Sequence, residues 1–188
     1  MEFQKLKIKD LILFKPNKIE DHRGSFQESY NQINFNKIVG KNIEFVQDNF
    51  SVSNKGVFRG IHFQKKPYEQ GKLVRVSLGR VIDFAVDLRK NSPTYLQWEK
   101  VELSDDNRFQ LWIPEGFGHA FITLEENTTV IYVVSQVYSF ENEGGAKFDD
   151  KMLKIDWPIN PTVLSDKDQK WPSIEERMEE FDNRFKDF

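Results

Sequence analysis

The sequence contains no cysteine, which excludes disulfide bonds, thiolate nucleophiles and cysteine metal ligands. It contains only three histidines, His22, His62 and His119. No two of them have the His-x-His or His-x-x-x-His spacing of a local metal-binding pair. Because a metal site needs several convergent ligands, we expect this protein to have none.

The chain also lacks an excess of one charge and any long apolar run. Lys and Arg number 27 against 30 Asp and Glu, for a net charge of -3, so we expect no basic surface for a nucleic acid. The N-terminal segment "MEFQKLKIKDLILFKPNKIED" interrupts its apolar residues with charges every few positions, unlike a signal peptide. No apolar run approaches membrane-spanning length. We therefore expect a cytoplasmic protein without a membrane segment.

What the sequence does contain predicts many short strands. The 188 residues suit one domain, and no internal repeat or linker divides them, so we expect a single domain over 1–188. Turn signals recur at short intervals, and the runs between them alternate with period two. In "RVIDFAVDL", Ile82 and Phe84 share one face while Val81, Asp83 and Ala85 share the other. The predicted fold class is an all-β sandwich or barrel.

Predicted helices are few and peripheral. "NFNKIVG" suits one or two turns that end at Gly40. A second helix is expected over about 173–185, because Ser173 and Glu176 have capping-box spacing and apolar residues recur with helical spacing after them. Both should lie outside the barrel.

Several strands carry reactive groups where alternation predicts a common face. Lys72 shares a face with Val74 and Val76, and a regular strand would direct its ammonium inward at a cost. Without further information we favour the alternative that Lys72 begins the strand and its ammonium reaches solvent. "VQDNFSVS" places Gln47, Asn49, Ser51 and Ser53 on one polar face, which is either solvated or lines a pocket. Taken alone, His62 and His119 are better interpreted as structural histidines that hydrogen-bond to the backbone.

Five segments, "DHRGSFQESY", "VQDNFSVSNKGVFRGIHFQKKPYEQGKLVRV", "PEGFGHAF", "YSFENEGG" and "IDWPINPTVLSDKD", closely resemble in order the dTDP-4-dehydrorhamnose 3,5-epimerase family of the cupin superfamily. The match runs from about Asp21 to Trp171. Phe140 stands where the family often has proline and Ala120 where glycine is common, but neither change removes a reactive group. The resemblance implies a jelly-roll barrel, a homodimer built by strand exchange, and no metal or nucleotide cofactor.

The resemblance also implies a substrate and a set of catalytic residues. The substrate would be dTDP-4-dehydro-6-deoxy-D-glucose, whose C4 ketone acidifies the hydrogens on C3 and C5. His62 would be the base, with Asp168 as its hydrogen-bond partner and Asp166 as a nearby rival. Lys72 would stabilise the enolate oxygen, and Tyr132 would return the proton from the opposite face.

Further residues match the substrate contacts of the family. In this resemblance Arg23 and Arg59 clamp the diphosphate and Tyr138 stacks on thymine. Because Arg59 and His62 would point to opposite faces of a regular strand, Gly60 between them is a candidate bulge. The complete expected set is Arg23, Glu28, Gln47, Asp48, Asn49, Arg59, His119, Tyr138, Glu143 and Lys167, with Arg23 and Glu28 contributed by the partner subunit.

Two alternatives remain open at this point. A related epimerase that inverts only C3 or only C5, or acts on an amino-substituted sugar, would use the same residues. A non-catalytic cupin that binds sugar nucleotides would keep Arg23, Arg59 and Tyr138 but should lack the base or the acid.

Overall fold

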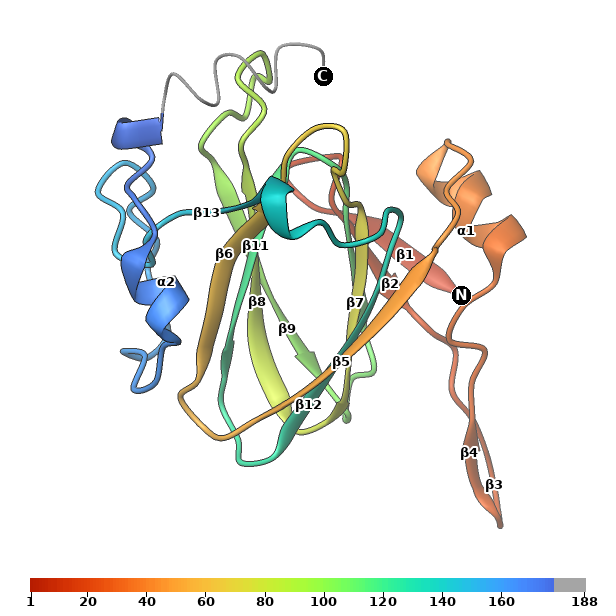
Figure 1. The fold of residues 1–188 in the computed structure, drawn as a ribbon. Helices are drawn as coiled ribbons and strands as arrows, with labels where there is room; N and C mark the ends of the chain where they lie inside the picture. The colour runs from red at the N-terminus through yellow and green to blue at the C-terminus, as the bar shows by residue number, and fades with distance from the viewer. Residues whose placement is uncertain (178–188) are drawn as a thin grey trace.

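The computed structural model describes residues 1–177 and contains two facing β-sheets (Figure 1). The six-stranded sheet has the order β1-β2-β10-β7-β12-β5, and the five-stranded sheet has the order β13-β6-β11-β8-β9. The first sheet comprises β1 (Glu2–Lys5), β2 (Ile12–Lys15), β10 (Gln110–Ile113), β7 (Lys72–Leu78), β12 (Thr128–Val134) and β5 (Gln47–Ser53). The second comprises β13 (Glu143–Gly145), β6 (Phe58–Gln64), β11 (Phe117–Thr123), β8 (Arg80–Asp87) and β9 (Trp98–Ser104).

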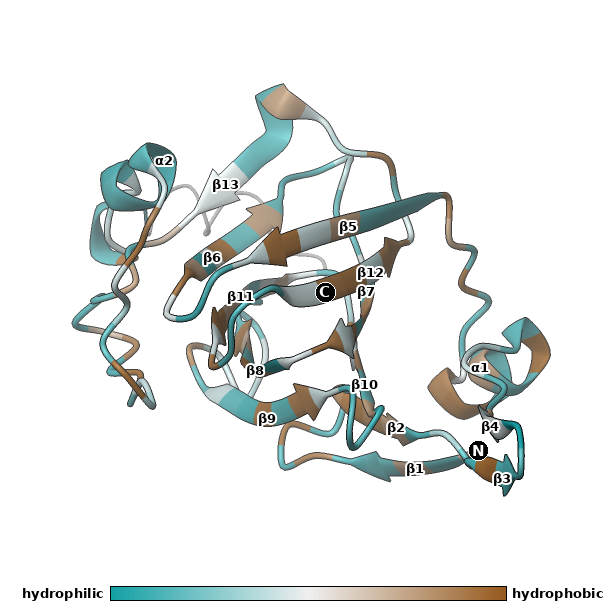
Figure 2. Ribbon diagram, turned by 90° about the horizontal axis from the view of Figure 1, so that it is seen from below, coloured by the Kyte–Doolittle hydropathy of each residue, from teal (hydrophilic) through white to brown (hydrophobic). Residues whose placement is uncertain are grey.

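The alternation of apolar residues determines which face of each strand is buried between the sheets. In β8, Val81 and Ala85 join the core between the sheets, while Ile82 and Phe84 pack on the outer face. That outer face is covered by the C-terminal segment through side chains such as Trp157. The prediction from "RVIDFAVDL" is confirmed, and the two sheets form the expected jelly roll, in which they face each other (Figure 2).

The helices lie outside the sheets, as expected. Helix α1 (Gln32–Val39) ends at Gly40, whose φ of 77° is left-handed, and it buries Phe35 against the outer face of the six-stranded sheet. Helix α2 (Asp166–Lys170) and the short 3₁₀ turns η1 (Phe140–Asn142) and η2 (Glu175–Arg177) complete the described elements.

The helix predicted over about 173–185 lies largely outside the described residues. Its expected capping box is present at the described end. The Ser173 backbone N–H donates to Glu176 Oε2 at 2.7 Å, and the Glu176 N–H donates to Ser173 Oγ at 3.2 Å. Up to Arg177 the chain forms the single turn η2 rather than an α-helix.

A hairpin of β3 (Ile19–Asp21) and β4 (Gly24–Phe26) projects away from the barrel (Figure 1). Every residue of both strands is exposed. Ile19 and Phe26 are paired across the hairpin and are 64% and 68% exposed. Such apolar side chains on an isolated two-stranded ribbon bury little surface within their own chain.

Strand β6 contains the bulge expected at Gly60. Its pairing with β11 joins His62 to His119 and Arg59 to Phe121, so β6 has one residue more than β11 between these pairs. Gly60 has a φ of 148°, and a Cβ there would collide with the side chain of Ala120. The extra residue allows Arg59 and His62 to line the same pocket.

Candidate active site

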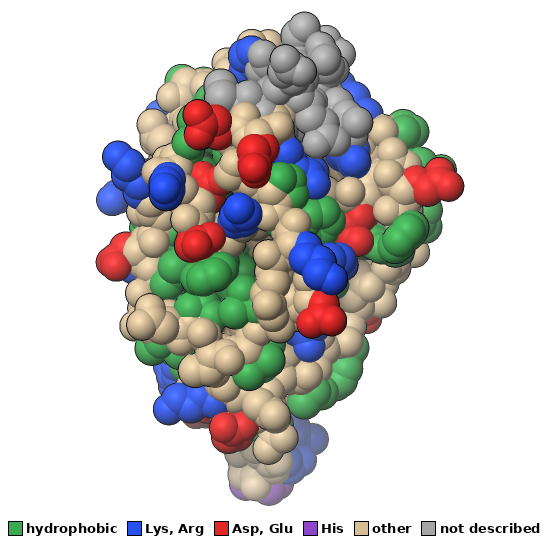
Figure 3. Space-filling model, turned by 60° about the vertical axis from the view of Figure 1, so that its left-hand side comes forward, with side chains coloured by type: hydrophobic (Ala, Val, Ile, Leu, Met, Phe, Trp, Pro, Cys, Tyr) green, Lys and Arg blue, Asp and Glu red, His purple; other side chains and the backbone are tan. Residues whose placement is uncertain are grey.

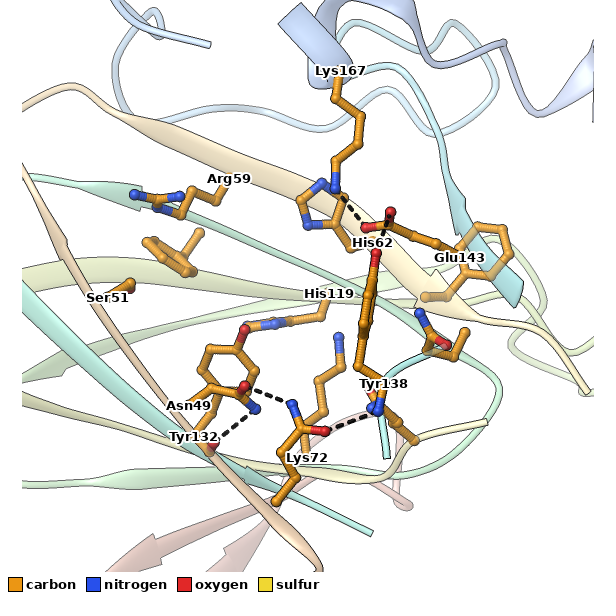
Figure 4. A pocket seen from close by; sticks show the side chains of 15 residues that line it. Asn49, Ser51, Arg59, His62, Lys72, His119, Tyr132, Tyr138, Glu143 and Lys167 are labelled. Atoms are coloured by element: carbon orange, nitrogen blue, oxygen red, sulfur yellow. Dashed lines mark hydrogen bonds and ion pairs between the residues drawn. The ribbon is translucent and has the colours of Figure 1, made fainter. Parts of the chain in front are cut away.

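A pocket of about 400 Å³ lies between the two sheets and is large enough for part of a small-molecule ligand. Its walls combine strands of both sheets with the segment after β12 and with α2 (Figure 4). The lining residues are Gln47, Asn49, Ser51, Arg59, His62, Phe63, Gln64, Gln70, Lys72, His119, Phe121, Tyr132, Tyr138, Glu143 and Lys167. The polar face of β5 therefore lines a pocket.

His62 is partly exposed to the pocket and is held by a buried carboxylate. Its Nε2 lies 2.5 Å from Oδ1 of Asp168, which confirms the expected contact across 106 positions of sequence. Asp168 is in the first turn of α2, where its own N–H donates to the Ser165 side chain at 3.1 Å. The rival Asp166 is exposed on the same helix.

The surroundings of Asp168 keep its carboxylate ionised, so that it can orient the imidazole of His62. Burial acts to raise the pKa of Asp168, but the hydrogen bond and charge of His62 outweigh it and hold the pKa below its ordinary value. A carboxylate on Nε2 favours the tautomer with the proton on that nitrogen. Nδ1 of His62 is then free to accept a proton.

Lys72 points into the pocket, and its side chain is buried. The predicted inward orientation is confirmed, because Val74 and Val76 on the same face belong to the core between the sheets. Among residues 1–177 no hydrogen bond or ion pair reaches its ammonium group. Burial lowers the pKa of Lys72 to about 8, although the negative charges of Asp83 and Glu143 oppose this effect.

Tyr132 lies across the pocket from His62, since it belongs to β12 of the six-stranded sheet and His62 to β6 of the facing sheet. Burial raises the pKa of Tyr132, so its hydroxyl remains protonated at neutral pH. A proton acceptor and a proton donor thus flank one cavity, which the Lys72 side chain also enters (Figure 4).

A chain of polar contacts forms the mouth of the pocket. The Tyr138 hydroxyl donates to Glu143 at 3.0 Å, and the Lys167 ammonium lies 2.6 Å from the other oxygen of Glu143. Gln47 accepts the Tyr138 backbone N–H at 2.8 Å and donates to Asn49 at 2.8 Å. Tyr138 is 47% exposed, which leaves it accessible to a planar ligand.

One member of a buried pair in the site, Asp83, was not predicted as functional, whereas its partner His119 was. His119 Nε2 lies 2.9 Å from Oδ2 of Asp83, and both side chains are buried. Burial lowers the pKa of His119, although Asp83 opposes the shift. Sequence alternation had placed Asp83 on one face with Val81 and Ala85, and a carboxylate on an apolar face was the available signal.

Three predicted contacts are not in the pocket of this chain. Asp48 is exposed on the outer face of β5, because strand residues alternate and its neighbours Gln47 and Asn49 face inward. Asp48 therefore does not line the pocket of this chain, and its role as a substrate contact stays a prediction. Arg23 is in the projecting hairpin, paired with Asp21, and exposed Glu28 accepts from Asn31.

The arrangement suits proton transfer at carbon next to a carbonyl. A base on one wall can remove a proton, a buried cation can stabilise the enolate oxygen, and an acid on the other wall can return the proton to the opposite face. Within the described range, no group of His, Asp and Glu is placed to hold a metal ion. No helix there is both long and apolar enough to cross a membrane.

The surface is consistent with the even charge balance of the sequence. The face in Figure 3 intersperses Lys and Arg with Asp and Glu, and it shows no continuous basic area for a nucleic acid.

Comparison with known proteins gives a family and several close relatives. The family model described as dTDP-4-dehydrorhamnose 3,5-epimerase matches residues 5–176. An enzyme of that name from Shigella flexneri is 49% identical over 168 residues, which is 89% of this chain and 93% of the relative.

Solved structures agree with the sequence matches. The Legionella pneumophila dTDP-6-deoxy-D-glucose-3,5-epimerase in complex with dTDP-4-keto-L-rhamnose has a TM-score of 0.92 at 40% identity, covering 96% of both chains. A 3'-monoepimerase from Streptomyces bikiniensis in complex with dTDP-quinovose has a TM-score of 0.82 at 29% identity, covering 96% of this chain and 98% of that one. The chain belongs to the dTDP-4-dehydrorhamnose 3,5-epimerase family.

Proposed function

We propose that this protein is a cofactor-independent isomerase that converts dTDP-4-dehydro-6-deoxy-D-glucose to dTDP-4-dehydro-L-rhamnose by inverting C3 and C5. The observation that carries the proposal is the placement of His62 and Tyr132 on opposite walls of one pocket that also contains the Lys72 ammonium. Family membership supplies the substrate class. The whole chain, 1–188, would act as one domain, and we propose that it works in the cytoplasm.

Each half of the substrate has a matching part of the site. His62, oriented by Asp168, removes the proton on C3 or C5, and the electron pair moves to the C4 oxygen beside Lys72. Tyr132 then protonates the same carbon from the opposite face, and solvent restores both groups. Around this centre, His119, Gln47 and Asn49 would contact the sugar nucleotide.

The nucleotide would extend toward the mouth of the pocket. Tyr138 offers the exposed ring for stacking on thymine, while Glu143 and Lys167 lie beside it. Arg59 lines the pocket and offers a planar donor group to the diphosphate.

The decisive test is incubation of the protein with the 4-keto substrate in D₂O, with deuterium at C3 and C5 counted by NMR. We expect deuterium at both carbons together with inverted product. Deuterium and inversion at only one carbon would favour the single-centre alternative, which the 3'-monoepimerase similarity keeps open. Binding without any exchange would favour a non-catalytic sugar-nucleotide-binding protein.

We further propose a homodimer in which the β3–β4 hairpin of one subunit reaches the other. Arg23 and Glu28 do not line the pocket of their own chain, and the hairpin exposes Ile19 and Phe26. The outer face of β5 exposes Phe50 at 67% and Val52 at 52%, an apolar area that a partner would cover. In the dimer, Arg23 of the partner subunit would complete the diphosphate site.

Light scattering at micromolar concentration should give twice the mass of one chain. Phe50→Asp places a charge on the exposed face of β5 and should shift the protein toward monomer and weaken dTDP binding. Met152→Asp, on an exposed residue of the C-terminal segment, is the matched control and should remain dimeric. A wild-type monomer under these conditions would contradict the proposal.

A further inference from the structure

Asp83 is a buried carboxylate whose two oxygens have different surroundings. It faces the interior from β8 with 0% exposure, on the face that also carries Val81 and Ala85. Oδ2 contacts His119 Nε2 at 2.9 Å, whereas Oδ1 has no hydrogen-bond partner among residues 1–177. An incompletely paired carboxylate at such a position is costly to bury, so its retention needs a compensating role.

The charged and titratable groups around Lys72 leave Asp83 as its available counter-charge. The charged and titratable side chains that line the pocket with Lys72 are Arg59 and His62 on β6, His119 on β11, Tyr132 on β12, Tyr138, Glu143 on β13 and Lys167 on α2. Asp83 on β8 does not line the pocket itself but contacts His119, and its negative charge acts on Lys72. Glu143 already contacts the Lys167 ammonium and the Tyr138 hydroxyl. His119 is buried and its pKa is lowered, so it does not neutralise Asp83 at neutral pH.

We propose that Asp83 is a positioning residue that keeps the Lys72 ammonium charged and holds His119 as the tautomer with its proton on Nε2. This inference rests on the proposed function, because a cation beside C4 matters only if an enolate forms there. The carboxylate acts through Lys72 and His119 and does not itself touch the substrate. His119 Nδ1 is then left as a hydrogen-bond acceptor for a sugar hydroxyl.

The sign of the charge on Asp83 determines the direction in which Asp83→Asn should shift the pKa of Lys72. Burial lowers the pKa of Lys72 to about 8, and the negative charge of Asp83 opposes that lowering. Asp83→Asn keeps the size of the side chain and removes the charge, so Lys72 should lose its proton at a lower pH than in the wild type. Each unit of such a shift changes the charged fraction about tenfold on the alkaline side.

The test is a ¹³C NMR titration of protein labelled at lysine Cε, without substrate, with the Lys72 resonance assigned by its absence in Lys72→Met. We expect the midpoint to move to lower pH in Asp83→Asn and to stay near the wild-type value in Asp83→Glu. The kcat/KM of Asp83→Asn should also be compared with that of the wild type at each pH. This relative activity should fall several-fold as the pH rises from 6.5 to 8.5. An unchanged midpoint in Asp83→Asn would overturn the proposal.

Asp87→Asn is the matched control, since Asp87 is equally buried on β8 but is bonded to Arg89, Ser92 and Thr94 away from the pocket. It should change stability without moving the Lys72 midpoint. If Asp83→Asn does not fold, ¹⁵N NMR of wild-type His119 still decides, because a proton on Nδ1 rather than Nε2 contradicts the proposal. A shifted Lys72 midpoint in a protein without epimerase activity would refute only the function.

Discussion

His62→Ala should abolish both deuterium exchange and epimer formation, with the rate falling by roughly 10²–10⁴-fold. His62 is held by the buried carboxylate of Asp168 and is partly exposed to the pocket, whereas His119 on the same sheet is buried. Without it, no enolate can form at either carbon. The measurement is deuterium content at C3 and C5 by NMR, together with product formation.

The control for His62→Ala is binding of dTDP, measured by calorimetry, because the nucleotide contacts lie toward the mouth of the pocket. Affinity and thermal unfolding should remain close to the wild type. Solvent exchange at the wild-type rate in His62→Ala would show that another group is the base.

Tyr132→Phe should separate exchange from inversion. It retains His62 and Lys72, so the α-proton still leaves and returns on the His62 side, and deuterium enters C3 or C5. Inversion should be nearly lost, because the hydroxyl that protonates the opposite face is missing. The ring is preserved, and the cavity between the sheets should be almost undisturbed.

Tyr30→Phe provides the matched control, since Tyr30 loses the same hydroxyl but packs against Phe35 and Phe45 beneath α1, outside the barrel. It should epimerise at the wild-type rate. If Tyr132→Phe also epimerises at that rate, Tyr138 or an ordered water becomes the next candidate for the acid.

Alternation within single strands predicted much of the fold and the centre of the site. The period-two alternation of side chains assigned the inner and outer faces of β8. It also placed Lys72 on an inward face and put Gln47 and Asn49 on the same face of β5. The local signal of Gly40 also placed the end of α1 correctly. These features depend on neighbours along the chain, which a sequence displays directly.

Other features depend on which strands pair and on what a second chain supplies. The contact of Asp83 with His119 requires β8 and β11 to be neighbours in a known register, which alternation alone does not provide. Asp48 was predicted as a substrate contact because the segment that contains it resembles the family, but adjacent residues of a strand face opposite sides, and its neighbours face the pocket. The proposed role of Arg23 needs a second subunit, so its place in one chain is a projecting hairpin.

The bulge in β6 makes the register of that strand a requirement for catalysis. Phe58 and Ile61 face the outer core, while Arg59, His62 and Gln64 face the pocket, so the in-and-out phase of the pleat is reset once, at Gly60. In a regular strand of the same length, the three-residue spacing would force either Arg59 or His62 to the wrong side. The bulge conformation at Gly60 therefore matters as much as the identity of these two side chains. Because a Cβ at Gly60 would collide with Ala120, we expect substitutions at Gly60 to be tolerated poorly.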